Sequence, residues 1–374
     1  MAGIYLHIPF CRQKCHYCNF YSLATKKYRN EIVIAMKREI ELNKDFFGGE
    51  PVQTIYFGGG TPSLLPVSEL IELIEKVKTT FEVSDEAEIT VEANPDDLTD
   101  EWLKSLSHSP ANRLSIGIQS FDDRDLHYLN RVHSAAEAKA GIGKAIAAGF
   151  SNLSIDLIYG IPTLSDETWL ENINTAVSLN IPHISAYALT VEEGTALDHL
   201  IRKGKYTPVD DEKAVTQFKL LMATLDQSGY EHYEISNFSL PGHYSRHNKA
   251  YWNDAKYLGI GPSAHSYDGR IRRWNVSNLG KYTEGISLGN GLFEFDKLTS
   301  TQHFNEYVMT SLRTMWGIDL AEVNKRFGQS CLDHLNRELK NPEIRGRIVT
   351  QDNKIVLTNE GKLFADRMAA GFFM

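Results

Sequence analysis

The stretch that decides the fold is YLHIPFCRQKCHYCNF, residues 5–20, in which a strand-like apolar run leads directly into three cysteines. Cys11, Cys15 and Cys18 follow the spacing C-x3-C-x2-C, and the fourth cysteine, Cys331, lies far away in the sequence. A disulfide framework needs an even, dispersed set of cysteines in a small secreted chain. We therefore expect a metal site at these three cysteines.

Two kinds of metal centre use clustered thiolates. Structural zinc closes its coordination shell with four ligands, and His16 is too near Cys15 and Cys18 in the sequence to share one tetrahedron with both. Four-iron clusters are held by cysteines, and three cysteines leave one iron open for chemistry. We favour a [4Fe–4S] cluster over zinc, mainly because of the motifs further along the chain.

The composition limits the class of protein. With 374 residues, 42% hydrophobic and 23% charged, the chain can bury a large core, and we expect one large domain plus a smaller one. The net charge of −9 argues against a surface that coats nucleic acid. No apolar run approaches about 20 residues, and MAGIYLHIPF does not resemble a signal peptide. We therefore expect no transmembrane segment, no nucleic-acid partner and a cytoplasmic location.

Strand-like and helix-like stretches alternate through the first half of the chain. Strands are expected at Ile4–Ile8, Thr54–Phe57, Glu88–Glu92, Arg113–Ile118, Asn152–Ile158 and His183–Leu189. Helices are expected at Glu31–Leu42, Val67–Val77, Ala135–Ala148 and Thr168–Leu179. Six such units at intervals of roughly 30–40 residues predict a parallel sheet with crossover helices.

Polar and glycine-rich residues follow the carboxyl ends of these strands, the edge at which parallel βα proteins collect functional groups. In chain order they are the cysteine loop, Gly58–Pro62, Glu92–Pro95, Gln119, Asp156 and Tyr187–Ala188. The sequence therefore predicts one site built from six strand ends.

Each of these residues alone also has an ordinary structural explanation. The glycines at 58–60 allow a close approach of ligand to backbone, but they equally suit a tight strand-to-helix turn. Glu92 and Asp156 can accept hydrogen bonds from ribose hydroxyls or an ammonium, and Arg131 can pair with a carboxylate. A single charged side chain is more often a solvent-exposed residue than part of a binding site. Asp156 differs, because an unpaired carboxylate inside an apolar strand is costly.

The motifs together carry a family resemblance. The cysteine spacing with the aromatic Tyr17, followed by GGGTP at 58–62, resembles the radical SAM (S-adenosylmethionine) superfamily. YLHIPFC, FGGGTPSLL, EANP, IGIQSF and DLIYGIP resemble the oxygen-independent coproporphyrinogen III oxidase family along nearly the whole chain. This resemblance implies an α/β fold, a partial (β/α)6 TIM-like barrel with SAM at the strand carboxyl ends.

The resemblance also implies cofactors and the residues that hold them. Cys11, Cys15 and Cys18 would ligate a [4Fe–4S] cluster, and the methionine amine and carboxylate of SAM would chelate the open iron. Reduction by a donor such as flavodoxin or ferredoxin would cleave SAM to a 5′-deoxyadenosyl radical. The implied cofactor-binding residues are Tyr5, Tyr17, Gly59, Gly60, Thr61, Glu92, Gln119, Arg131, Asp156 and Ala188.

Two features separate the branches of this family. The branch that decarboxylates coproporphyrinogen III in porphyrin biosynthesis resembles C-x3-C-x2-C-x-C, but Phe20 occupies the position of the extra cysteine here. That branch also carries a substantial extension before the cluster, whereas ten residues precede Cys11. Coproporphyrinogen III dehydrogenase, an oxidoreductase activity, is therefore the alternative function and not the expected one.

The segment HNKAYW, residues 247–252, matches the H-N-x-x-Y-W motif of the heme chaperone (HemW-like) branch. A neutral imidazole at His247 suits heme iron, and Tyr251 and Trp252 offer aromatic surface to a macrocycle. A histidine beside aromatics is more often a packed residue, but the matched motif and the absence of the extra cysteine at Phe20 together favour ligation. His243 is a competing ligand, although the preceding Pro-Gly pair opposes a helix there. We expect a chaperone that transfers heme to an acceptor protein such as a respiratory haemoprotein.

The domain organisation is expected to have three parts: a barrel over 1–235, a connecting segment with the HNxxYW motif over 236–297, and a winged-helix-like C-terminal domain over 298–374. The C-terminal elements are helices at Thr301–Trp316, Leu320–Phe327 and Cys331–Lys340, a hairpin at Arg347–Thr358 and a last helix from about Asn359. With ten Lys/Arg against nine Asp/Glu, residues 298–374 do not favour DNA. A lid or docking surface over the barrel mouth is the expected role.

Overall fold

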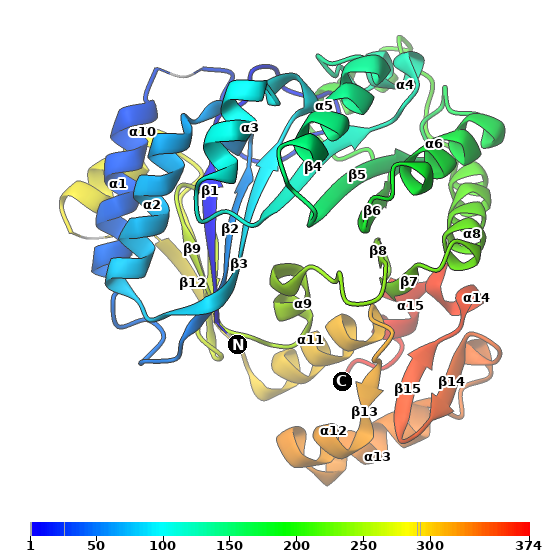
Figure 1. Ribbon diagram of the computed structural model, residues 1–374. Helices are drawn as coiled ribbons and strands as arrows, with labels where there is room; N and C mark the ends of the chain where they lie inside the picture. Colours follow the sequence, from blue (N-terminus) through cyan, green and yellow to red (C-terminus); the bar gives the residue numbers. More distant parts are fainter. Residues whose placement is uncertain (1, 26, 290, 292) are drawn as a thin grey trace.

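The computed structural model describes residues 2–25, 27–289, 291 and 293–374, and its centre is a 12-stranded sheet (Figure 1). The first six strands pair in parallel in chain order, as predicted. They are β1 (Ala2–Ile8), β2 (Val52–Gly59), β3 (Val83–Ala93), β4 (Arg113–Gln119), β5 (Leu153–Tyr159) and β6 (His183–Ala188). The sheet curls, so these strands form the wall of a partial barrel (Figure 1).

Helices cover the outer face of this wall (Figure 1). They are α1 (Arg29–Leu42), α2 (Val67–Thr80), α3 (Asp100–Ser107), α4 (Asp123–Tyr128), α5 (Ala135–Ala147), α6 (Asp166–Ser178), α7 (Ala196–Arg202) and α8 (Asp211–Gln227). Each main helix buries an apolar stripe, for example Leu70, Ile74 and Val77 of α2. Ser134 and Glu137 form a capping box that fixes the start of α5.

The strands present apolar side chains outward and polar side chains inward. On β4, Leu114 and Ile116 belong to the main hydrophobic core, while Ser115 and Gln119 line a cavity inside the barrel. This alternation follows from the two-residue period of a strand. The interior of the barrel is consequently polar, which suits a polar ligand.

The strands within residues 236–297 join the same sheet, whereas the sequence suggested a connecting segment. Four of their strands extend one edge: β9 (Tyr257–Ile260) pairs in parallel with β1, and β10 (His265–Tyr267), β11 (Ile271–Asn275) and β12 (Phe293–Lys297) follow. At the other edge lie β8 (Asn237–Ser239) and β7 (Glu231–Glu234). These added strands form hydrogen bonds with backbone groups of β1 and β6 that would otherwise be exposed at the edges of the sheet.

A buried carboxylate ties this extension to the barrel. Glu39 of α1 is 4% exposed, and its oxygens accept hydrogen bonds from the Gly261 amide (2.8 Å), the Asn275 amide (2.7 Å) and the Tyr282 hydroxyl (2.6 Å). Tyr282 belongs to α10 (Leu279–Ser287). Burial raises the pKa of Glu39, and the three donors oppose that rise.

Replacing Glu39 by alanine is expected to lower the free energy of unfolding by about 3 kcal/mol, because three buried donors lose their acceptor. Urea denaturation followed by circular dichroism measures the change. Glu41→Ala is the control: this carboxylate lies on the same helix but pairs only at the surface, with Arg38 and Lys76. Equal losses in the two variants would contradict the assigned role.

The C-terminal part has its own hydrophobic core, which includes Phe304, Leu335 and Ile355. Its helices are α11 (Ser300–Leu312), α12 (Leu320–Phe327), α13 (Gln329–Glu338), α14 (Asn359–Lys362) and α15 (Ala365–Ala370). A three-stranded antiparallel sheet runs in the order β13 (Ile318–Asp319), β15 (Lys354–Leu357), β14 (Ile348–Gln351). As predicted, Asp352 and Asn353 form the hairpin turn, both with positive φ (49° and 63°).

The position of this domain differs from the lid that the sequence suggested. It lies beneath the barrel, at the amino ends of β1 to β6, on the side opposite the cysteine loop (Figure 1). The helix α9 (Arg246–Trp252) lies between the two parts and contacts β1, β2 and α11. Sequence patterns fix where strands and helices form, but the packing between two units depends on surfaces that no local pattern describes.

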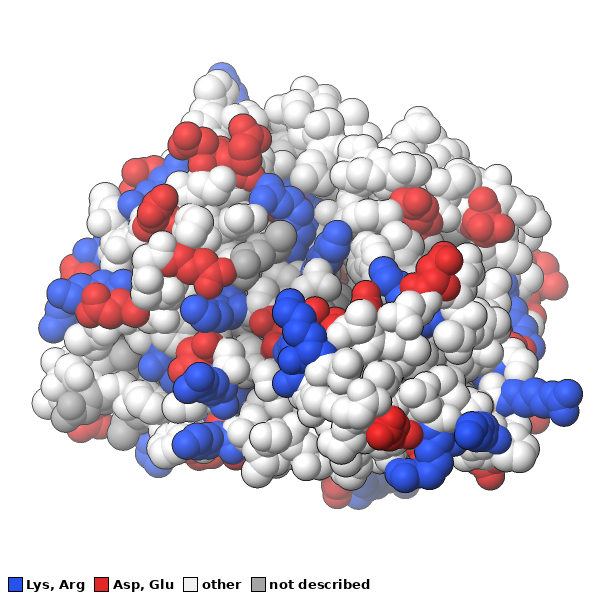
Figure 2. Space-filling view, turned by 90° about the horizontal axis from the view of Figure 1, so that it is seen from below, with Lys and Arg blue, Asp and Glu red and all other residues white. Residues whose placement is uncertain are grey.

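On the face seen from below, basic and acidic side chains are interspersed and neither sign forms a broad patch (Figure 2). Within the described part of the chain, no helix combines the length and the apolar character needed to cross a bilayer.

Candidate functional site

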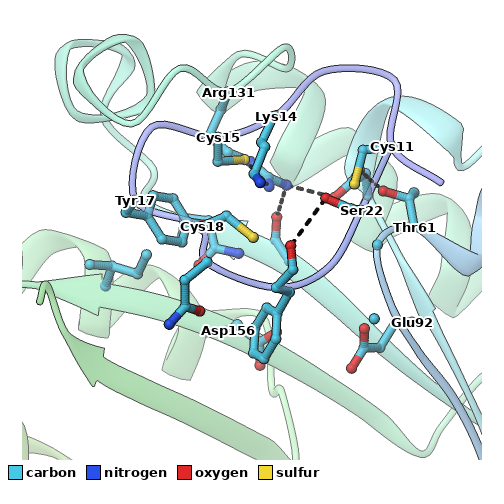
Figure 3. A pocket seen from close by; sticks show the side chains of 18 of the residues that line it. Cys11, Lys14, Cys15, Tyr17, Cys18, Ser22, Thr61, Glu92, Arg131 and Asp156 are labelled. Atoms are coloured by element: carbon cyan, nitrogen blue, oxygen red, sulfur yellow. Dashed lines mark hydrogen bonds between the residues drawn. The ribbon is translucent and has the colours of Figure 1, made fainter. Parts of the chain in front are cut away.

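A cavity of about 440 Å³ opens at the carboxyl ends of the parallel strands (Figure 3). The loop after β1 crosses over it and carries Cys11, Cys15 and Cys18 (Figure 3). The predicted site residues that line it are Cys11, Cys15, Tyr17, Cys18, Gly59, Gly60, Thr61, Glu92, Gln119, Arg131, Asp156 and Ala188. Six strand ends therefore contribute to one cavity.

Backbone hydrogen bonds hold the cysteine loop at both ends. The Cys11 amide donates to the Leu23 carbonyl (3.0 Å), and the Leu23 amide donates to the Pro9 carbonyl (2.8 Å). Within the loop, the Cys18 amide donates to the Cys15 carbonyl (3.3 Å). The cysteine thiols themselves are free and half-buried, so they stay available as ligands.

The donor set fits an iron–sulfur cluster. Each cysteine of such a cluster ligates a different iron, so the three thiols need only surround a common space. Cys11, Cys15 and Cys18 all line this cavity, so the residues present fit a cluster.

Arg131 lies directly beside the cysteine loop. Its guanidinium donates to the Cys15 sulfur (3.3 Å), the Asn94 side-chain oxygen (2.7 Å) and the Gly117 carbonyl (2.8 Å). Burial disfavours the charge, but Tyr17 and Cys15 hold the pKa of Arg131 above its ordinary value. The side chain is thus a fixed cation at the cavity wall. Asn94, which orients it, was missed as a site residue although EANP was recognised as a motif.

Two carboxyl groups lie deeper in the cavity. The Tyr56 hydroxyl donates to Glu92 (2.8 Å). Burial, reinforced by the charge of Asp156, raises the pKa of Glu92 to about 7. Burial raises the pKa of Asp156 to about 6. Buried carboxylates that titrate near neutrality are typical of functional sites.

Arg113, at the start of β4, is a functional candidate that the sequence analysis missed. It is 1% exposed, and its charge lowers the pKa of both Glu92 and Asp156. Its Nε and one Nη have no hydrogen-bond partner within the described residues. The sequence could have indicated it, because the arginine begins the apolar run RLSIGIQ. A charged side chain that is buried in such a run needs an opposite charge nearby.

The glycines at the end of β2 are required by close packing. A Cβ on Gly60 would lie 2.5 Å from the Phe10 carbonyl oxygen and 2.8 Å from that of Ile8. Gly59 has φ of +107°, a conformation that L side chains rarely adopt. The glycines thus let β2 approach the start of the cysteine loop.

The mouth of the cavity carries exposed aromatic surface. The side chain of Phe20 is 64% exposed and that of Tyr187 is 43% exposed, and both line the opening. Lys14, also on the cysteine loop, adds a cation at this rim (Figure 3). Tyr187 was expected at the end of the sixth strand. Lys14 lies in the predicted cysteine loop but was not singled out, since an isolated lysine gives no recognisable pattern.

His247 lies below the cavity, inside the base of the barrel. It is 2% exposed, and its Nδ1 and Nε2 are in hydrogen-bonding contact with the hydroxyls of Thr54 (2.8 Å) and Tyr251 (3.0 Å). Its ring stacks on Tyr56 with centroids 4.9 Å apart, and burial lowers its pKa to about 3. The imidazole is neutral, as a heme ligand must be, but neither nitrogen is free. Heme ligation by His247, which stays a prediction, would require the ring to give up one of these hydrogen bonds and to become accessible.

Tyr5 is the other predicted site residue that does not line the cavity. Its hydroxyl is in hydrogen-bonding contact with His7 Nδ1 (3.2 Å), and its ring stacks on Tyr56 with centroids 6.1 Å apart. Tyr5 therefore supports the floor of the cavity from below.

Comparisons with known proteins agree with this geometry. The family described as Radical SAM superfamily matches residues 5–176, and that described as HemN C-terminal domain matches residues 298–364. The solved structure of coproporphyrinogen III oxidase (HemN) from Escherichia coli has a TM-score of 0.86 at 24% identity, covering 100% of this chain and 90% of that chain. This likeness establishes the shared fold.

Two relatives extend over essentially the whole chain. A heme chaperone HemW from Mycobacterium tuberculosis is 36% identical over 370 residues, covering 97% of this chain and 93% of the relative. A heme chaperone HemW from Bacillus subtilis is 33% identical over 377 residues, covering 100% and 99%.

The partial barrel and its cysteine-lined cavity define a radical SAM protein. Within that superfamily, the chain belongs to the heme chaperone (HemW) branch of the oxygen-independent coproporphyrinogen III oxidase family.

Proposed function

We propose that this chain is a cytoplasmic heme chaperone that holds a [4Fe–4S] cluster, SAM and heme, and transfers the heme to an acceptor such as a respiratory haemoprotein. The observation that carries the proposal is Phe20, an exposed aromatic at the cavity mouth in place of an additional thiol. The names of the full-length relatives support it.

Cys11, Cys15 and Cys18 would hold the cluster and leave one iron without a protein ligand. That iron would take the amine and carboxylate of SAM, whose cleavage after reduction by a flavodoxin or ferredoxin would supply radical chemistry. Arg131 offsets negative charge beside Cys15, and it can also pair with a carboxylate. Because the three thiols, this cation and the buried carboxylates share one cavity, the residues present fit both groups.

The affinity for SAM is expected to rise with pH, since ionised carboxylates accept hydrogen bonds from ribose hydroxyls more strongly than neutral ones. Glu92 has a pKa of about 7 and Asp156 of about 6, so both are ionised above that range and protonated below it. Equilibrium binding of SAM to the reconstituted protein between about pH 5 and pH 8 measures the profile.

Glu92→Gln should make the rise of affinity with pH shallower, because only Asp156 of the pair then titrates in this range. A wild-type affinity that is flat across this range, or a variant whose profile equals that of the wild type, would contradict the assignment of these carboxylates to SAM.

The alternative function is coproporphyrinogen III dehydrogenase, because the chain shares the fold of HemN with a TM-score of 0.86. Anaerobic incubation of the reconstituted, reduced protein with SAM and coproporphyrinogen III, followed by product analysis, separates the two functions. A chaperone should give no stoichiometric decarboxylation and should bind added heme. Stoichiometric conversion to protoporphyrinogen IX would contradict the chaperone proposal.

A further inference from the structure

A second hollow lies outside the barrel wall, between α4 and the segment 203–207 that follows α7. Its volume is about 630 Å³, and it shares no lining residue with the cysteine-lined cavity. We call it the α4 groove; its lining residues are Asp123, Arg124, His127, Tyr128, Pro162, Thr163, Lys205, Tyr206 and Thr207. Most of these side chains reach solvent, so a ligand can enter without any rearrangement of the barrel.

Two tyrosines form the inner wall of the α4 groove. Tyr128 is only 6% exposed, so the half-buried Tyr206 supplies most of the accessible aromatic surface. The rings of Tyr128 and Tyr206 have centroids 4.7 Å apart at 47°. The Tyr128 hydroxyl donates to the Thr207 carbonyl (2.8 Å), which fixes the wall against the 203–207 segment. Pro162 adds a further apolar surface. Such a surface suits a large, planar, apolar ring system.

His127 offers the groove an unengaged imidazole. It is exposed, and neither ring nitrogen has a hydrogen-bond partner within the described part of the chain. His247 differs in both respects, because it is buried and both of its nitrogens are engaged. An imidazole with a free nitrogen is a suitable axial ligand for heme iron.

The rim of the groove carries positive charge. Lys205 forms no ion pair with any other described residue, and Arg124 pairs with Asp122, its guanidinium 2.9 Å from the carboxylate. The groove also contains the carboxylate of Asp123. This carboxylate accepts a hydrogen bond from the Ala135 amide at the start of α5 (2.7 Å). The lysine and arginine complement the two propionates of heme.

The groove and the cysteine loop share His16, which lies between Cys15 and Cys18. His16 Nδ1 is 3.1 Å from the Tyr128 carbonyl oxygen, and its ring meets Tyr206 edge-on with centroids 5.4 Å apart. The cysteine loop therefore contacts both tyrosines of the groove through one side chain.

We propose that the α4 groove is the heme site of this chain, with His127 as axial ligand, Tyr206 against the macrocycle and backed by Tyr128, and Arg124 and Lys205 at the propionates. The inference rests on the proposed function, that the chain carries heme. It assigns the heme to a surface beside the cluster loop, which separates the heme from SAM and leaves its outer face open to an acceptor.

Titration of the full-length protein with hemin, followed by visible absorbance, tests this site. His127→Ala is expected to weaken hemin binding by at least about tenfold, the scale of losses at metal sites. His127→Gly should behave alike, and free imidazole should restore the histidine-ligated spectrum. His108→Ala is the matched control, because His108 is another exposed histidine and does not line the groove. Its binding should equal that of the wild type.

The outcomes separate the site from the function. Wild-type protein that binds no hemin would overturn the proposed function and this inference with it. If hemin binding is unchanged in His127→Ala, the assignment of heme to the α4 groove is wrong, while the proposed function stands. Loss of binding in His247→Ala, with His127→Ala intact and both variants folded by circular dichroism, would overturn the groove in favour of His247. Weakened binding in Tyr206→Ala together with His127→Ala supports the groove.

Discussion

Serine in place of Cys15 is expected to abolish cluster assembly. Cys15 is one of only three thiols around the cavity, and serine is a much weaker ligand for iron than a thiolate. The variant also loses the sulfur that accepts from Arg131, so a buried cation loses a partner. Iron and acid-labile sulfide after anaerobic reconstitution should fall from about four of each per chain to near zero.

Cys331→Ser is the control for this experiment. Cys331 packs beside the core of the C-terminal domain and does not line the cavity. Its substitution should leave the iron and sulfide content unchanged. A Cys15→Ser protein with a full cluster, or a Cys331→Ser protein without one, would contradict the ligand assignment.

Alanine in place of Gly60 is expected to destabilise the protein by about 3 kcal/mol and to displace the cysteine loop. The added Cβ would lie 2.5 Å and 2.8 Å from the carbonyl oxygens of Phe10 and Ile8, and these backbone atoms cannot rotate away. The Gly60 amide, which donates to the Ile8 carbonyl at 2.8 Å, would be pushed from its acceptor. Urea denaturation measures the stability, and cluster content reports on the loop.

Gly143→Ala provides the opposite case. Gly143 lies in α5, and a Cβ there would meet nothing within 4 Å. Because alanine favours helix over glycine, this variant should gain about 0.5–1 kcal/mol. A Gly60→Ala protein as stable as the wild type would show that the approach of β2 to the loop is not tight.

Local patterns predicted the framework of the barrel. Each of the six expected strands overlaps one of β1 to β6, because buried parallel strands read as short apolar runs between helical periods. The residues after those runs, such as Gly59 and Glu92, could then be assigned to one cavity, since parallel strands end at the same edge. The cysteine spacing identified the loop directly.

Other features depend on contacts between distant parts of the chain. The strands β9 to β12 are short, and only the pairing of β9 with β1, followed by β10, β11 and β12 in turn, reveals them as part of the main sheet. The burial of His247 results from α9 filling the base of the barrel, which a motif on that helix cannot show. The α4 groove brings Tyr128 and Tyr206 together from segments about 80 residues apart, so neither tyrosine alone predicts it.

The account depends most on the cysteine-lined cavity being a cluster site with one open iron for SAM. Electron paramagnetic resonance of the reconstituted, reduced protein, recorded with and without SAM, tests this claim directly. We predict the spectrum of a reduced [4Fe–4S] cluster that changes when SAM is added, because SAM then ligates the iron that lacks a cysteine. A cluster spectrum that SAM does not alter, or a protein that retains zinc in place of iron, would contradict the claim.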